Sequence, residues 1–355
     1  MTARPRSRAG MRVLVTTNMY PTAERPAFGI FVARQVASLE RAGMAVVVET
    51  VSGHRGAADY WHARRRIARQ VREFRPDLIH AHYGLTSIPS AGQGVPFVVT
   101  LYGDDINGQS TGRGRITFKS RLSVLATQLL NLAAARVLVQ SEAMQSRLWP
   151  SARARSDVVP SGIDEDLFSP RPRGEARQHL ALPSEGWVLG FVNSGGQPTK
   201  RLDLAQATAA ELERRGHKVT LLVAEKVSVA EMPWYYRASD CLLMTSDLEG
   251  SPNCVKEALA CGTPIVSVPV GDVPQVVDSA ERGRITDRNP AALADAVADL
   301  LGTAPVALDT VPPSLLPPRL RSGAVAMQLR EIYAGVLAQR QRAVSPAGSL
   351  PGEAG

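Results

Sequence analysis

The chain has 355 residues, of which 44% are hydrophobic, a length that suits about two domains with an apolar core each. It carries 41 Lys and Arg against 33 Asp and Glu, giving a formal net charge of +8 and a sequence pI near 9.7. No apolar run approaches the ~18 residues of a transmembrane helix, and none follows Arg4, Arg6 and Arg8 as a secretory signal requires, so we expect a cytoplasmic protein.

The positive charge is concentrated in the first half of the chain. Residues 12–165 contain 19 Lys and Arg against 12 Asp and Glu, a net +7. Such a surface fits an anionic partner: nucleic acid, a membrane surface or a phosphorylated substrate. It equally fits a solvated arginine-rich surface, and charge alone does not choose among these alternatives.

In the first half, apolar runs alternate with helical patterns. Strands are predicted at 11–16, 45–51, 77–81, 97–101, 137–140 and 157–159. A helix is predicted over 28–42, and a basic amphipathic helix over 60–74 whose apolar face packs on the sheet. Alternating strands and helices are typical of a parallel, doubly wound sheet. Residues 11–165 are therefore expected to form one Rossmann-like domain after a disordered tail at 1–10.

The second half repeats the alternation after a Pro- and charge-rich linker at 166–185. Strands are predicted at 187–192, 218–223, 241–245 and 264–268, and helices at 202–214 and 252–260. Residues 186–312 are thus expected to form a second Rossmann-like domain. A helical segment within 313–341 is expected to return to the first domain, and 342–355 to be a disordered tail.

The segment from Thr245 to Gly262 carries the strongest chemical signal. A strand is expected to end near Thr245, and a helix to follow with Ser251 as its N-cap and Pro252 at its first position. The unpaired amides of such a helix start bind phosphate or diphosphate. Here these amides belong to Asn253, Cys254 and Val255.

Two glutamates in this segment are candidates for contacts with a sugar nucleotide. Glu249 precedes the helix, in the loop, where it is placed to meet a sugar. Glu257 lies inside the helix, and its carboxylate suits the paired hydroxyls of a ribose. Two solvated glutamates on an ordinary capped helix are the alternative.

A second candidate phosphate site spans Phe191 to Leu202. A strand enters a glycine-rich turn, and Lys200 comes just before a helix. A flexible backbone can approach a phosphate closely, and a lysine adds a point charge. A surface turn with a solvated lysine is the alternative.

Three further positions lie in the first half. Gly29 stands at a predicted helix start, where the missing Cβ lets the backbone approach a ligand. His82, near the end of a strand, is a candidate acceptor contact or a structural histidine. Asp104 and Asp105 are adjacent, point apart on an extended chain and have no third ligand nearby, so no metal site is predicted.

The cysteines match no zinc pattern and are expected to be reduced thiols: Cys241, Cys254 and Cys261.

Several segments together resemble the retaining glycosyltransferases of family 4 (glycosyl transferases group 1). The resemblance rests on two glutamates with seven residues between them, a Cys-Gly-Thr-Pro-Ile-Val run, a Gly-Asp-Val run, and two flanking motifs. These are Glu249 and Glu257, residues 261–266, 271–273, 159–168 and 232–240. The resemblance implies the GT-B fold, in which two Rossmann-like domains face each other across a cleft.

The resemblance also implies roles for individual residues. The catalytic residues would be Glu249 and Lys200. The donor would be bound by Gly29, Lys200, Arg201, Glu249, Gly250, Ser251, Asn253, Cys254, Val255 and Glu257. The acceptor would be bound by His82, Tyr102 and Asp105. The chain departs from the family where Gly195 replaces an arginine, with Arg201 as a candidate replacement, and where Tyr102 replaces a histidine.

The implied function is a hexosyl transfer from a nucleotide-diphosphate sugar to a lipid-linked, polysaccharide or small-molecule acceptor. It would proceed with retention, without a metal or cofactor. The basic helix at 61–74 and a second cluster suggest electrostatic contact with an anionic membrane, on its inner face. That cluster is Arg113, Arg115, Lys119 and Arg121.

Three other functions remain open at this point. A GT-B sugar-nucleotide epimerase needs acid and base groups at the donor, and Tyr102 argues against it. A non-catalytic glycosyltransferase-like subunit fits the replaced histidine and arginine. A nucleic-acid binder fits the pI, but no basic motif with interleaved aromatic residues is present.

Overall fold

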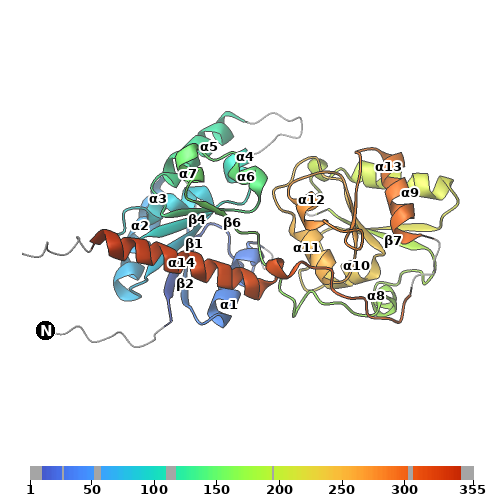
Figure 1. Cartoon of the computed structure of the whole chain (residues 1–355), viewed down its shortest axis with the longest axis horizontal. Coiled ribbons are helices and arrows are strands. Elements are labelled where there is room, and N and C mark those ends of the chain that lie inside the picture. Colours follow the sequence, from blue (N-terminus) through green and yellow to red (C-terminus); the bar gives the residue numbers. More distant parts are fainter. Residues whose placement is uncertain are drawn as a thin grey trace, which may run out of the picture.

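The structure of the protein is a computed structural model that describes residues 10–25, 28–51, 57–108, 117–193, 196–302 and 307–344. The chain forms two α/β domains side by side (Figure 1). Within the described residues, the first has a six-stranded sheet in the order β2-β1-β3-β4-β5-β6, and the second a five-stranded sheet in the order β11-β10-β9-β7-β8. The paired strands are parallel. The predicted fold class, two Rossmann-like α/β domains, is confirmed.

The predicted strands are all present, and the structure adds β11 at the edge of the second sheet. In the first domain the strands are β1 (Arg12–Thr17), β2 (Ala45–Thr50), β3 (Leu78–His82), β4 (Phe97–Thr100), β5 (Arg136–Val139) and β6 (Ser156–Val158). In the second they are β7 (Trp187–Val192), β8 (Val219–Ala224), β9 (Cys241–Met244), β10 (Ile265–Ser267) and β11 (Gly283–Ile285).

Helices connect these strands and cover both sheets. The helices up to the linker are α1 (Ile30–Arg41), α2 (Ala57–Glu73), α3 (Ser87–Ser90), α4 (Asp104–Asn107), α5 (Phe118–Asn131), α6 (Glu142–Gln145) and α7 (Pro150–Arg153). The later ones are α8 (Arg173–His179), α9 (Leu202–Arg214), α10 (Met232–Ala238), α11 (Asn253–Ala260), α12 (Val273–Val276), α13 (Pro290–Leu301) and α14 (Ser322–Val344). Short 3-10 turns are η2 (Gly84–Thr86), η4 (Pro198–Lys200) and η5 (Pro318–Leu320). Within the described residues, none of the helices has the length and apolar character that crossing a bilayer requires.

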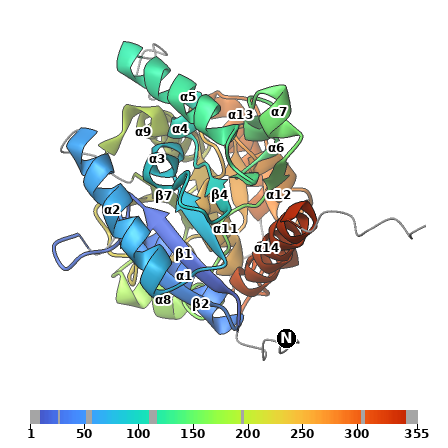
Figure 2. The same cartoon turned by 90° about the vertical axis from the view of Figure 1, so that its left-hand side faces the viewer.

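The first sheet is buried on both faces because its strands are apolar on both sides. Along β1, Val13 and Val15 face a core shared with α1 and α14, whereas Leu14 faces a core shared with α2. Figure 2 shows α2 and α14 on opposite sides of the strands. The helix predicted over 60–74 is α2, and its apolar face buries Ala63 and Ile67 completely.

The second domain has one continuous apolar core around its sheet. Helix α9 packs against α13, and α10 packs against α8 and α11. The chain passes between the two domains twice, and the two connecting segments are hydrogen-bonded to each other. The amide of Ile163, after β6, donates to the carbonyl oxygen of Leu320 at 2.9 Å, and the Ser322 amide donates back to Ile163 O at 2.9 Å. From there α14 runs back along the first domain and packs on α1.

Candidate active site

The strand orders place a ligand site at one point of the second sheet. The order reverses between β7 and β9, where the chain after each strand turns to opposite sides. In open parallel sheets, ligands bind at the carboxyl ends of the strands at such a switch point. The loop after β7 contains the glycine-rich turn, and the loop after β9 contains Glu249. The two strongest sequence signals therefore lie side by side in space.

A cavity of about 520 Å³ opens at this point. Helices α10 and α11 and the loops after β7, β8 and β9 contribute its walls. Its lining residues are Val192, Lys200, Ala224, Lys226, Val227, Val229, Met232, Tyr236, Glu249, Ser251, Pro252, Asn253, Cys254 and Glu257. The lining combines apolar side chains, such as Val227, Val229 and Met232, with charged ones.

Lys200 and Glu249 form an ion pair in this cavity. Lys200 Nζ donates to Glu249 Oε1 at 2.6 Å, and both side chains are largely shielded from solvent. Burial disfavours the ammonium, but the paired carboxylate of Glu249 favours it, and the pKa of Lys200 is raised. Burial raises the pKa of the Cys254 thiol to about 12, so that side chain is neutral. The site therefore presents one fixed cation next to one carboxylate.

Helix α11 begins one residue later than predicted. Its N-cap is Pro252, whose side chain cannot cap, and not Ser251. The Ser251 hydroxyl instead donates to Asp272 Oδ2 at 2.6 Å and accepts from Lys256 Nζ at 3.0 Å. The hydroxyl therefore bridges two buried ionisable side chains, with charge-assisted hydrogen bonds, and does not cap the helix. The first-turn amides, starting at Asn253, still lie at a helix start.

Asn253 itself brings an unusual polar atom to the helix start. Its Oδ1 is buried and has no hydrogen-bond partner in the described part of the chain. Leaving such an atom unpaired costs free energy in the folded protein. An amide oxygen at the wall of this cavity is thus available to a ligand's hydrogen-bond donor.

Glu257 is held by one group from each domain. Tyr236 on α10 donates its hydroxyl to Glu257 Oε2 at 2.8 Å, and Arg34 on α1 donates Nη1 to Oε1 at 3.1 Å. The guanidinium of Arg34 also lies over the Phe168 ring, 4.9 Å from its centroid. Its Nη2 is buried without a partner among the described residues. The ribose candidate therefore lies where the two domains meet.

The loops of the first domain that carry His82 and Tyr102 bring two neutral side chains to this side of the site. His82 Nδ1 and the Tyr102 hydroxyl share a hydrogen bond of 2.6 Å, and His82 Nε2 is buried with no partner among the described residues. Burial, together with the neighbouring His80, lowers the pKa of His82 well below 6.5. Burial also raises the pKa of Tyr102 well above 10. Both groups are uncharged at neutral pH.

Asp105 holds the loop that carries Tyr102. Its carboxylate accepts hydrogen bonds from the backbone amides of Tyr102, Gly103 and Gly84 at 3.0–3.3 Å. Burial raises its pKa to about 6 despite these amides, which favour the charged form. The structure thus gives Asp105 a loop-shaping position, and its contact with an acceptor remains a prediction.

Two of the predicted glycines stand in crowded places, Gly29 within the first domain and Gly250 between the two domains. Gly29 has φ +69°, and a Cβ there would lie 2.3 Å from the carbonyl of Met19. A Cβ on Gly250 would lie 3.3 Å from Met144 Sδ and 3.5 Å from the Tyr102 carbonyl oxygen. The loop of Glu249 therefore lies directly against the loop of Tyr102.

Comparison with known proteins agrees with this geometry. The model of the Glycosyltransferase Family 4 matches residues 6–167, and that of the Glycosyl transferases group 1 matches residues 185–303. The chain belongs to the family 4 glycosyltransferases.

Relatives of this glycosyltransferase include carbohydrate enzymes from several bacteria. It is 24% identical to the putative teichuronic acid biosynthesis glycosyltransferase TuaC of Bacillus subtilis, over 81% of this chain and 88% of that protein. It is 29% identical to a D-inositol 3-phosphate glycosyltransferase of Actinosynnema mirum, over 57% of this chain and only 58% of that protein. The structure of HepE from Anabaena, solved with UDP and glucose, matches 94% of this chain and 99% of its own, with a TM-score of 0.61 and 17% identity.

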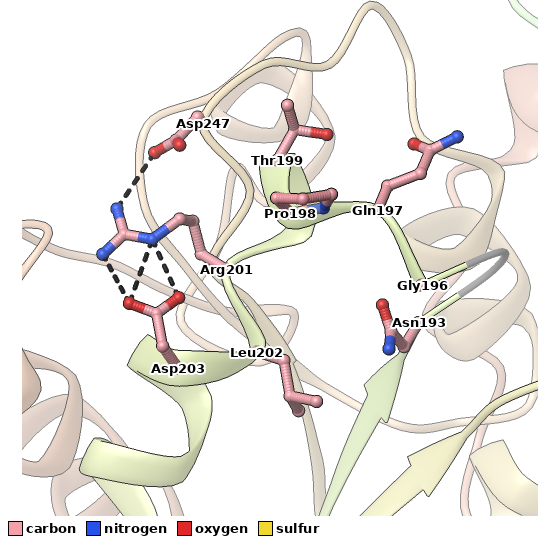
Figure 3. Close-up of a pocket in the computed structure, with 9 residues that line it drawn as sticks. All are labelled: Asn193, Gly196, Gln197, Pro198, Thr199, Arg201, Leu202, Asp203 and Asp247. Atoms are coloured by element: carbon pink, nitrogen blue, oxygen red, sulfur yellow. Dashed lines mark hydrogen bonds and ion pairs between the residues drawn. The ribbon is translucent and has the colours of Figure 1, made fainter. Parts of the chain in front are cut away.

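Within this glycosyltransferase, Arg201 does not line the cavity, and neither do Gly29, Gly250 and Val255 of the predicted donor residues. Lys200 ends η4, and Arg201 has a left-handed backbone with φ 59°, which turns its side chain away. Its guanidinium pairs with Asp203 at 2.8 Å and with Asp247 at 3.2 Å, beside a separate pocket of about 490 Å³ (Figure 3). The structure therefore gives no support to Arg201 as the replacement cation. Gly195, the position of the missing arginine, lies outside the described residues.

Some residues of the site were missing from the prediction. Arg34 and Tyr236 hold Glu257, and Lys256 and Asp272 hold Ser251. Tyr236 lies in the run 232–240 that supported the resemblance, so a hydroxyl beside a buried glutamate could have been anticipated. Arg34 could not, because its partner is 223 residues away in the other domain. In the described residues, no cluster of three or more His, Cys, Asp or Glu side chains is arranged to hold a metal ion.

Proposed function

We propose that this glycosyltransferase moves a hexose from a nucleoside-diphosphate sugar to a hydroxyl acceptor, with retention of configuration and without a metal ion. The observation that carries the proposal is the convergence of Lys200, Glu249 and Glu257 on one cavity at the start of α11. The HepE structure with UDP and glucose supports a nucleotide-sugar donor.

The cavity divides into regions that suit the parts of such a donor. The diphosphate is proposed to lie at the first-turn amides of α11 and at Lys200, since helix starts and lysines bind phosphate. The ribose hydroxyls are proposed to donate to Glu257. The base is proposed to lie against Val227, Val229 and Met232, which are apolar residues of the wall.

The same arrangement suits the chemistry of transfer. The bond between the anomeric carbon and the diphosphate oxygen breaks, the acceptor oxygen bonds to that carbon, and the acceptor's proton leaves with the diphosphate. Negative charge grows on the departing diphosphate, where Lys200 and the α11 amides are already oriented. Glu249 is placed to stabilise positive character on the sugar.

The acceptor is proposed to approach from the first domain. The loop of Glu249 touches that of Tyr102, and His82 Nε2 is an unpaired polar atom on that side. A lipid-linked, polysaccharide or small-molecule acceptor would be positioned by His82 and Tyr102. We further propose that the enzyme acts in the cytoplasm at the inner membrane face.

A screen of nucleotide sugars tests the proposal. Purified protein is incubated with UDP-, GDP-, ADP- and dTDP-sugars in EDTA, and release of free nucleoside diphosphate is measured with and without hydroxyl acceptors. We expect one donor to release its diphosphate, and NMR of the product to show the donor's anomeric configuration. An epimerised donor without diphosphate release, or activity only after a divalent ion is added back, would contradict the proposal.

A further inference from the structure

Helix α5 carries large apolar side chains on its solvent side. Five of them have exposed fractions between 39% and 75% and follow one another at intervals of three or four residues: Phe118, Leu122, Leu125, Leu129 and Leu132. At ~100° per residue they lie within an arc of about 80°. A continuous apolar stripe of this kind marks a binding surface, unlike apolar residues scattered singly.

The opposite face of α5 is polar, although it is buried against the protein. Its buried residues are Thr127, Gln128 and Asn131, and the helix packs on η2 and α4. In the residues that the structure describes, Thr127 Oγ1 and both polar side-chain atoms of Asn131 have no hydrogen-bond partner. Buried unpaired polar atoms cost free energy, and so do leucines left in water. Turning the leucines of α5 outward is therefore unfavourable in water. It becomes favourable where that face contacts an apolar environment such as a membrane.

The charges that α5 itself carries have one sign. Lys119 and Arg121 are exposed and flank the stripe on its two sides. The helix contains no Asp or Glu. An apolar face with basic flanks complements a bilayer that contains anionic lipids. A second copy of the chain would instead bring like charges together across a two-fold interface.

We propose that α5 is an interfacial helix that docks the protein on anionic membranes, with its apolar stripe inserted at the level of the headgroups. This goes beyond the proposed transfer reaction and does not depend on it. It adds apolar insertion through α5 to the electrostatic contact predicted from residues 61–74 and from Arg113, Arg115, Lys119 and Arg121, which stays a prediction. Helix α5 packs on α4, which follows Tyr102, so docking sets the proposed acceptor side near the bilayer.

Sedimentation of the full chain with vesicles tests this docking. Wild-type protein should bind phosphatidylcholine vesicles that contain phosphatidylglycerol more than pure phosphatidylcholine vesicles. Part of the binding should persist at about 0.5 M salt, because screening does not weaken apolar burial. The double variant Leu122→Ser/Leu129→Ser should bind at least about tenfold more weakly, since a buried leucine contributes about that much. Met327→Ser, which changes an exposed apolar residue on α14, should bind like wild type.

Two further measurements distinguish insertion of α5 into the membrane from unfolding of the variants and from other kinds of binding. All three positions are exposed, so circular dichroism should give wild-type melting midpoints for both variants. Phe118→Trp fluorescence should be quenched by brominated lipids, relative to the background of the four native tryptophans. The proposal is overturned if the double variant binds as wild type does, if salt releases all the protein, or if the stripe instead supports a dimer that the double variant dissociates.

Discussion

The two domains share a topology but present opposite chemistry at their facing edges. In the second domain, charged groups are paired across short distances: Lys200 with Glu249, and Lys256 with Asp272 through Ser251. In the first domain Arg34 reaches across to Glu257, but the side chains beside Tyr102 are neutral, because burial lowers the pKa of His80 and His82 and raises that of Tyr102. A Rossmann-like sheet therefore fixes where a site lies, and the loops after its strands decide what it can bind.

This difference has a consequence for the proposed reaction. A departing diphosphate needs a cation and amides that are already oriented, and only the second domain supplies both at one place. A neutral hydroxyl acceptor needs hydrogen-bonding groups without charge, and the first domain supplies those. The comparison therefore supports the proposal that the donor binds the second domain and the acceptor the first.

The largest expected effect is a loss of turnover that distinguishes Lys200 from its neighbour Arg201. Lys200→Ala should lower turnover by about 10²- to 10³-fold, because it removes a group that stabilises charge in the transition state. Nucleotide affinity should fall less. Arg201→Ala is the matched control and should change turnover little, since its ion pairs lie at the surface away from the cavity. Initial rates in EDTA measure turnover, and calorimetric titration measures nucleotide affinity. Equal losses of turnover in the two variants would contradict the placement of the donor in the cavity of Lys200 rather than in the pocket beside Arg201.

A second prediction concerns the backbone on the first-domain side. Gly29→Ala should destabilise the protein by more than the ~1–2 kcal/mol of a left-handed residue, because its Cβ would also meet the Met19 carbonyl at 2.3 Å. Gly43→Ala is the control, since Gly43 has φ +82° but nothing lies within 4 Å of its Cβ. Urea unfolding should show a larger loss at Gly29, and catalysis should change only there. Similar losses would show that the loop of Met19 yields easily.

A smaller effect follows from the buried histidines. Burial lowers the pKa of His80 to about 3, while the unfolded chain takes up the proton near pH 6.5. Its contribution to stability is therefore complete above pH 6.5 and is lost as the pH falls from there toward 3. Between pH 7.5 and 5.5 one such histidine accounts for about 1.4 kcal/mol.

The comparison of wild type with His80→Gln isolates this contribution. Asp105 acts in the opposite direction, because its pKa is raised to about 6, and stability gained from it appears as the pH falls through 6. Asp105 is present in both proteins, so it cancels in the difference. Urea midpoints at the two pH values should show a shallower loss for His80→Gln. An identical slope in both proteins would mean that His80 is protonated in the folded state.

The sequence predicted the sheets well because parallel buried strands are apolar throughout and leave clear runs, such as 187–192 and 241–245. It also predicted Lys200, Glu249 and Glu257 as site residues, and the structure brings them to one cavity. The contact of Arg34 with Glu257 was beyond prediction, because it depends on how the two domains meet. The outward turn of Arg201 depends on one left-handed residue, which no neighbouring glycine or asparagine signals.

Helix α5 shows a different limit. Its apolar residues have a clear helical period, but period alone does not say whether the stripe faces the core or the outside. The structure turns Thr127 and Asn131 inward and the leucines outward. A helix face that docks on a membrane therefore has the same sequence pattern as a helix face that packs into the core.

The central claim is that the cavity at the start of α11 binds a nucleoside diphosphate, and calorimetry tests it directly. UDP, ADP and GDP are titrated into wild type, Glu257→Ala and the control Glu231→Ala, whose glutamate is exposed at the N-cap of α10 and pairs with His179. We expect one nucleotide to bind wild type and Glu231→Ala alike, and Glu257→Ala roughly 10- to 100-fold more weakly, because the ribose loses a charged partner. Unchanged affinity in Glu257→Ala, with its melting midpoint preserved, would contradict the account.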